Sequence, residues 1–315
     1  VRCSLLFSVW HGFILTAQQS LGVLFQTCVA RCGYCGFMAE LIALSPSRAN
    51  DFVSCPLKFR LRSVDKIPEP PSAVAFKGTL VHAVLEQLFD VQPHERTLDH
   101  ANTLIEPTYA SLAQKNSDVS ELFPEQTDRD KLFTEAASLV RAYFTLELPQ
   151  NLEPDAREKF VQTELPGGLK LRGFIDRVDR ASGGEVRLVD YKTGKAPKPQ
   201  YSGEADFQMR FYALVHYMLT GEIVHTLQLM YLGSGHVKEL KPTMQDIERT
   251  FFQVADVWND ITSCAESGNW RPKKSPLCNW CYFKTMCPAW GNEAPEAPQI
   301  TNVAVVEPDF PRTAR

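Results

Sequence analysis

The sequence lacks a surplus of positive charge, because 33 lysines and arginines stand against 37 aspartates and glutamates and give a formal net charge of −4. It therefore has no overall basic field, and a nucleic-acid partner would have to be held by a local patch. It also lacks internal repeats, and its 44% hydrophobic and 22% charged residues exclude collagen, a coiled coil and wholesale disorder. This composition is typical of a globular enzyme.

Residues 1–37 contain no Asp, Glu, Lys or Pro, and only Arg2 and Arg31 carry a formal charge. Their apolar stretch Leu5–Leu15 is too short to span a bilayer, and no clear small-x-small cleavage site follows it. We therefore predict a cytoplasmic protein without a membrane partner. Ordinary amphipathic sequence begins just after Met38, so we interpret residues 1–37 as a disposable leader or one foreign to the native protein.

Hydrophobic periodicity and turn-forming residues divide the rest of the chain into helices and strands. Ser45 before Pro46 marks the start of a helix that we extend to about Leu61. Further helices are predicted at 76–90, 205–220 and 243–267, strands at 169–180, 185–194 and 225–233, and a polar, helical insertion at 91–160. The tail 291–315, rich in Pro and Glu, is predicted to be disordered. The mixture predicts an α/β fold with a central mixed sheet flanked by helices.

The segments LKLRGFIDRVDR and EVRLVDYKTG alternate in polarity around the turn ASGG, which predicts a β-hairpin. Asp176 ends the core of one strand, and Asp190 and Lys192 lie two apart on one face of the next. Carboxylates among apolar neighbours need neutralising, and Mg²⁺ is bound by such oxygens together with water and phosphate. The pattern favours phosphodiester hydrolysis, with Lys192 placed to orient the attacking water. An isolated D-x-K pattern is more often a surface ion pair worth under about 1 kcal/mol.

Close cysteine spacing marks a second candidate site. Cys278, Cys281 and Cys287 form C-x2-C-x5-C, which suits an iron-sulfur or zinc site that needs one more ligand. Nine cysteines that cluster in this way indicate metal or cluster binding and not a disulfide framework.

GFIDRVDR followed by VDYKTGKAP resembles the motifs of the PD-(D/E)XK nuclease superfamily, in particular its RecB-like exonuclease branch. The resemblance implies a restriction-endonuclease-like core within a nuclease domain over residues 38–290. It also implies that Asp176 and Asp190 bind Mg²⁺ or Mn²⁺, that the backbone carbonyl of Tyr191 completes the coordination, and that Lys192 is catalytic.

Two further motifs extend the resemblance. GTLVHAVLE looks like the family's G-x-x-x-H helix, which implies that His82 is a metal ligand, and QMRFY is similar to its Q-x-x-x-Y element, which implies that Gln208 and Tyr212 lie beside the DNA channel. Lys195 and Lys198 follow the hairpin and are placed to bind phosphates, although a solvated loop has the same composition.

The same branch holds a [4Fe-4S] cluster with one early and three late cysteines, which implies that Cys55 joins Cys278, Cys281 and Cys287. Zinc is the alternative, because four thiolates also suit it. Glu164, just before the hairpin, is a secondary candidate for a second metal. Cys28, Cys32 and Cys35 resemble the cluster motif of radical S-adenosylmethionine enzymes, but no run of βα repeats follows them.

The resemblance therefore implies a DNA exonuclease that acts on single strands or duplex ends in repair or recombination. The alternative is a non-catalytic DNA-binding or helicase-accessory module with the same fold. No G-x-x-x-x-G-K-[ST] phosphate loop is present, so any unwinding would come from a separate helicase partner.

Overall fold

The computed structural model describes residues 38–116 and 118–310. The predicted leader, with its group of Cys28, Cys32 and Cys35, lies outside the described residues. Within them, no helix is both long and apolar enough to cross a membrane.

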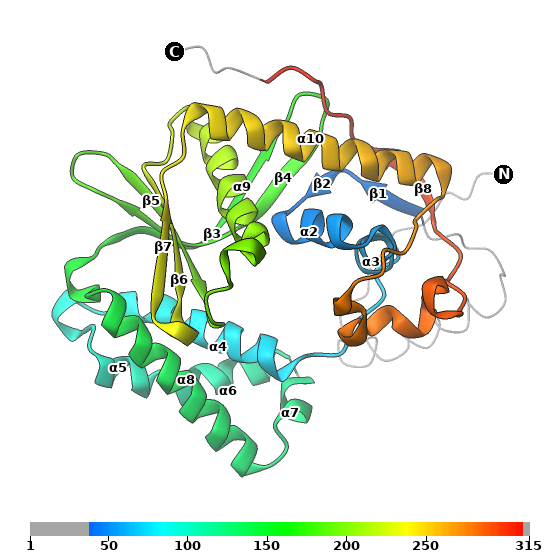
Figure 1. Ribbon diagram of the computed structural model, residues 1–315. Helices are drawn as coiled ribbons and strands as arrows, with labels where there is room; N and C mark the ends of the chain where they lie inside the picture. Colours follow the sequence, from blue (N-terminus) through cyan, green and yellow to red (C-terminus); the bar gives the residue numbers. More distant parts are fainter. Residues whose placement is uncertain (1–37, 117, 311–315) are drawn as a thin grey trace, which may run out of the picture.

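A six-stranded mixed sheet forms the centre of the protein (Figure 1). The strand order is β2-β4-β5-β6-β7, and β3 pairs with β4 off this path. The β4–β5 hairpin is antiparallel and β5–β6 is parallel, which confirms the predicted hairpin and mixed sheet. The strand bounds are β2 Ala43–Leu44, β3 Pro154–Glu164, β4 Lys170–Arg180, β5 Val186–Lys192, β6 Thr226–Tyr231 and β7 His236–Leu240.

Helices pack on both faces of this sheet, so the predicted α/β layering is confirmed (Figure 1). Leu188 of β5 contributes to one hydrophobic core, whereas Val189 and Tyr191 contribute to the other, as alternating strand residues do. The first core is covered by α2 Pro46–Ser54, α3 Pro56–Phe59, α9 Gly203–Thr220 and α10 Met244–Ser267. The second is covered by α4 Ala73–Gln87, α5 Leu98–Thr103, α6 Ile105–Lys115, α7 Asp118–Leu122 and α8 Gln126–Leu146.

The helical insertion is shorter than predicted. Its α-helices end with α8, a 3-10 turn follows at Pro149–Asn151, and residues from Pro154 onward form β3, which pairs with β4 along most of its length. The segment AREKFVQTE is dominated by polar residues, so periodicity alone gave no strong strand signal. Pairing with β4 decides its conformation.

The predicted helix 45–61 is interrupted once. Ser45 caps α2 by accepting a hydrogen bond from the backbone N–H of Arg48, as its position before Pro46 predicted. The chain becomes extended at Cys55, and Pro56 starts α3, because proline suits a first helical turn but not a helix interior. A π-helical turn, Arg60–Val64, continues from α3.

The tail departs from the predicted disorder. Strand β8 Gln299–Val303 pairs in parallel with β1 Met38–Leu41. Beyond it, Ala304 and Val306 are buried, and the Ala304 carbonyl accepts a hydrogen bond from Trp258 Nε1 (2.7 Å). The Pro- and Glu-rich composition hid these apolar residues, whose burial holds the tail against the domain.

Candidate active site

The two strands of the central hairpin separate next to Asp176. Regular β4–β5 pairing ends at Arg177 and Val189, one residue short of Asp176. Where it ends, Asp176 Oδ2 accepts a hydrogen bond from the backbone N–H of Tyr191 (2.7 Å). This opening, here called the strand fork, therefore places a carboxylate where a strand would otherwise continue.

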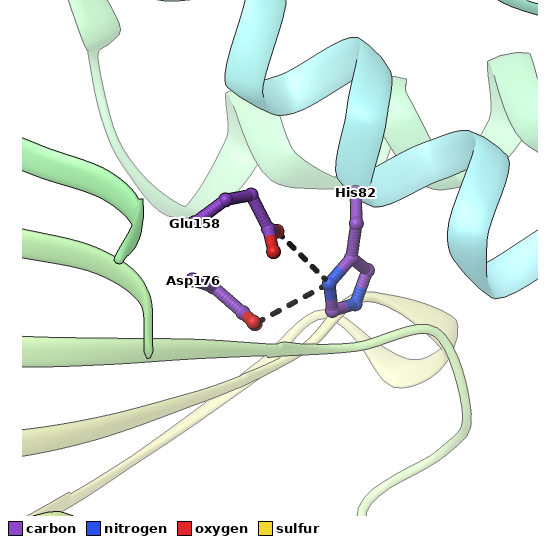
Figure 2. A group of neighbouring side chains, drawn as sticks. All are labelled: His82, Glu158 and Asp176. Atoms are coloured by element: carbon purple, nitrogen blue, oxygen red, sulfur yellow. Dashed lines mark ion pairs between the residues drawn. The ribbon is translucent and has the colours of Figure 1, made fainter. Parts of the chain in front are cut away.

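Three potential metal ligands converge at the fork (Figure 2). His82 Nδ1 of α4 lies 3.4 Å from Asp176 Oδ2 and 3.9 Å from Glu158 Oε1. One ligand atom from each of these residues lies within 4.8 Å of the others. Imidazole nitrogen and carboxylate oxygens, all partly exposed, are a donor set that fits Mg²⁺ or Mn²⁺.

Glu158 is the member of this group that sequence reasoning missed. It lies on β3 between the pairs Arg157–Arg177 and Lys159–Ile175, and so faces Asp176 across the strands. Its φ of 42° is unusual for a residue other than glycine, and such strain is found at functional sites. The secondary candidate Glu164 lies instead at the far end of β3, opposite Lys170. Predicting the β3–β4 register would have identified Glu158.

Asp190 and Lys192 lie on β5 and face α9. The Asp190 carboxylate is buried, and its Oδ2 lies 2.7 Å from Lys192 Nζ. Asp190 Oδ2 is buried and already paired with this ammonium group, so a metal ion would share the oxygen with Lys192. The three residues predicted to be catalytic are thus gathered at the fork, with Asp176 contributed by β4.

Gln208 connects the acid and the lysine. Its Nε2 donates to Asp190 Oδ1 (2.8 Å), and its Oε1 accepts from Lys192 Nζ (2.7 Å). Gln208 Nε2 also lies 3.4 Å from the Tyr212 hydroxyl, and the Tyr212 ring packs against Gly173, where a Cβ would come within 2.6 Å of Tyr212 Cε1. The Q-x-x-x-Y element therefore braces the β5 side chains.

The electrostatics of the fork favour an added positive charge. Burial, and then the charge of Asp176, raise the pKa of Glu158 to about 7. Burial and Asp176 likewise raise the pKa of Asp190 to about 6, although Lys192 opposes this shift. Burial alone would lower the pKa of His82, but hydrogen bonding and attraction to Asp176 outweigh it and raise that pKa. A divalent cation would relieve the repulsion among the carboxylates.

A cleft of about 1110 Å³ leads to the fork. The predicted residues that line it are His82, Tyr191, Lys192, Lys195, Gln208 and Tyr212. Lys198 is not among the lining residues and precedes a short 3-10 turn at Pro199–Tyr201. The backbone N–H of Tyr191 faces Asp176, while its hydroxyl accepts a hydrogen bond from Arg177 (2.6 Å).

The four predicted cluster ligands, Cys55, Cys278, Cys281 and Cys287, line a separate cavity of about 350 Å³, here called the cysteine cavity. The backbone N–H of Lys273 donates to Cys55 Sγ (3.4 Å), and that of Ser275 donates to Cys278 Sγ (3.3 Å). In the described part of the chain, only His82, Glu158 and Asp176 bring three possible ligand atoms within 4.8 Å of one another. The sulfurs share a cavity but do not gather at single-ion spacing.

A mixed sheet whose central hairpin carries two aspartates and a lysine at a strand fork defines a restriction-endonuclease-like nuclease. Residues 43–288 match the PD-(D/E)XK nuclease superfamily, and the chain belongs to this superfamily. It is a nuclease of that class, as the hairpin motifs predicted.

Two phage proteins and one solved structure are similar to this chain. The gene 69 protein of Mycobacterium phage D29 is 27% identical over 267 residues, and that of Mycobacterium phage L5 is 24% identical over 297 residues. Each match covers 78% of this chain and 96% of the relative. The crystal structure of a “Putative exonuclease” from Eubacterium rectale has a TM-score of 0.52 at 17% identity, over 86% of this chain and 93% of that one. This likeness supports the shared fold.

Proposed function

We propose that this nuclease is a Mg²⁺- or Mn²⁺-dependent DNA exonuclease of the RecB-like branch, acting on single strands or duplex ends. The observation that carries the proposal is the convergence of His82, Glu158 and Asp176 beside the Asp190–Lys192 pair, next to a cleft of about 1110 Å³. In this proposal His82, Asp176 and Asp190 hold the metal, with Glu158 and the Tyr191 carbonyl as further ligands.

The bound metal would polarise the phosphodiester and lower the pKa of a water molecule. The chain's own residues prepare the surrounding charges. Lys192 is held by Asp190 and Gln208 on one side, so its ammonium group has a fixed direction and one donor left for a water or a phosphate oxygen. It would orient the attacking water and stabilise the negative charge that develops on the phosphate.

Labelled single-stranded DNA tests this proposal. We expect degradation with Mn²⁺ and loss of degradation in Asp190→Ala, with the fold retained. Glu185→Ala is the matched control, because Glu185 is an exposed acid just before the same strand. Cleavage that survives Asp190→Ala would place the activity elsewhere. Circular DNA separates endonuclease from exonuclease action, and 5′- and 3′-labelled strands give the polarity.

We further propose that the protein works in DNA repair or recombination, with a separate helicase to supply single strands. The missing phosphate-loop motif in the sequence supports this division of labour. Co-purification of a helicase with the tagged protein, and stimulation of duplex degradation by that helicase, are the expected results. Equal degradation of long duplexes by the isolated protein would contradict the need for such a partner.

We also propose that the cysteine cavity holds a [4Fe-4S] cluster. The four cysteines come from both ends of the domain, and backbone N–H groups donate to two of their sulfurs, as they do to cluster thiolates. Lys58, Lys273 and Lys284 line the same cavity and would offset the negative charge of thiolates. Anaerobic purification should give brown protein with iron and acid-labile sulfide. Colourless, zinc-loaded protein would replace the cluster with zinc.

A further inference from the structure

Two phenylalanines are exposed side by side in the cleft. Phe160 of β3 and Phe174 of β4 are paired across the strands, with ring centroids 5.2 Å apart and planes inclined by 52°. Their exposures are 52% and 56%, although each is large and apolar. Single exposed apolar residues need no explanation, but an adjacent exposed aromatic pair that lines a cleft indicates a binding surface.

The position of this pair relates it to the fork. Phe160 lies two residues from Glu158, and Phe174 lies two residues from Asp176. Two residues of a strand span about 7 Å, and alternate residues share a face. Both rings line the cleft together with His82 and Lys192. The aromatic pair therefore lies on the same two strands as Glu158 and Asp176, one cross-strand position farther along the surface.

Two arginines extend the same surface. Arg172, two residues beyond Phe174, and Arg48 both line the cleft, and among residues 38–116 and 118–310 no acid forms an ion pair with either. Burial, and then the charge of Arg172, lower the pKa of Arg48. The nearby acid Asp51 is already paired with Lys58 and Arg62. Arg48 donates to the backbone carbonyl of Ala43 (3.4 Å), but neither arginine has an acidic partner among the described residues. Two such guanidinium groups in one cleft favour an anionic ligand such as phosphate.

We propose that Phe160 and Phe174 stack a base of a single DNA strand next to the scissile phosphate, while Arg48 and Arg172 bind neighbouring phosphates. The inference rests on the proposed nuclease function and names the subsite that selects the substrate. In a duplex, both faces of an interior base are covered by adjacent bases, so only a single or frayed strand offers a free face. Base–aromatic stacking tolerates any sequence, which suits a processing nuclease.

A binding comparison between normal and abasic DNA tests the subsite. Binding is measured by fluorescence anisotropy with Mn²⁺ in Lys192→Ala protein, so that hydrolysis is slow compared with the measurement. Adding Phe160→Leu and Phe174→Leu should weaken binding of a normal single strand by about 5- to 150-fold, the range for one lost stacking contact. An oligonucleotide with abasic sites at successive positions should bind the parent protein similarly weakly. The doubly substituted protein should no longer distinguish the two oligonucleotides.

Two variants keep the result interpretable. Phe252→Leu is the matched control, because Phe252 is 46% exposed on α10 and does not line the cleft; it should bind like the parent protein. Phe174→Trp retains a stacking surface and should preserve the preference for normal over abasic DNA. The stacking role is wrong if the Phe160→Leu, Phe174→Leu protein keeps the preference for normal over abasic DNA. It is also wrong if Phe174→Trp weakens binding as much as the double substitution does.

The outcome separates this inference from the proposed function. Loss of Mn²⁺-dependent cleavage in Asp190→Ala concerns the fork alone, whereas the abasic comparison involves no hydrolysis. Cleavage that depends on Asp190, together with no contrast between normal and abasic DNA, would reject only the stacking subsite.

Discussion

The strand fork and the cysteine cavity differ in what holds their residues in place. At the fork, side chains project from β3, β4, β5 and α4, which are held by backbone hydrogen bonds and by two hydrophobic cores. At the cavity, three cysteines lie on or between short 3-10 turns, Pro276–Trp280, Tyr282–Met286 and Pro288–Trp290, and the fourth follows α2. Isolated short turns are weakly stable. The fork is therefore pre-formed, whereas the cavity should depend on what its cysteines bind.

Because the fork is pre-formed, substitutions there should lower nuclease activity and leave the fold unchanged. Substitutions at the cysteine cavity should loosen the local structure and change nuclease activity least.

After Asp190→Ala, Lys192→Ala should have the largest effect on the reaction. Removing the ammonium group takes away charge stabilisation at the phosphate, and a loss of roughly 10²- to 10³-fold in kcat is expected. The measurement is single-turnover cleavage of labelled single-stranded DNA at saturating Mn²⁺. Calorimetry should show that Mn²⁺ still binds, because the carboxylates and His82 remain. A rate within about threefold of the wild type would show that Lys192 has no role in the reaction.

Glu158→Gln should have the next largest effect, which is a loss of metal affinity. The substitution keeps the size of the side chain and removes one of three converging ligands, so Mn²⁺ binding should weaken by roughly ten- to a hundredfold. Calorimetry gives the dissociation constant. Glu164→Gln, at the far end of the same strand, is the matched control and should bind Mn²⁺ like the wild type. Equal effects of the two substitutions would exclude Glu158 from the site.

The residues of the strand fork differ in whether the sequence alone could predict that they lie together. Asp176, Asp190 and Lys192 lie on a hairpin whose alternation and turn are local signals, so their proximity followed from the sequence. Glu158 did not, because it joins them through the pairing of β3 with β4, which is not encoded in any local pattern. Its positive φ also departs from the regular strand that periodicity describes.

Elements defined by local signals were predicted elsewhere in the fold as well, whereas elements defined by distant pairing were not. The helices α9 and α10 were predicted because their apolar faces and end signals are continuous in sequence, with Gly221 ending the first and Thr243 capping the second. Strand β8 was missed because its partner, β1, lies more than 250 residues earlier. Exposure of Phe160 and Phe174 likewise depends on which surfaces the tertiary fold leaves open, and an aromatic residue in a strand is usually part of a core.

Gln208→Leu should have a smaller effect than either charged substitution. Its amide positions Asp190 and Lys192 by neutral-to-charged hydrogen bonds, and their loss should lower kcat by roughly two- to tenfold. KM for DNA should change little, and this split distinguishes a positioning residue from one that binds DNA. Tyr212→Phe, which removes the 3.4 Å contact with Gln208 and leaves both hydrogen bonds of the Gln208 amide to Asp190 and Lys192, should be milder still. A KM increase with unchanged kcat would instead place Gln208 against the strand.

Cys281→Ser should alter the chemistry least and local order most. If the cysteines bind a cluster, replacing one should release it and free the short turns, while β4 and β5 keep their hydrogen bonds and cores. Hydrogen exchange by mass spectrometry should therefore accelerate in residues 276–290 and stay unchanged in residues 170–192. Cys264→Ser is the control, because Cys264 lies on α10 and does not line the cavity. Unchanged exchange in residues 276–290 of cluster-free protein would show that packing around the buried Phe283, and not a bound group, maintains the cavity.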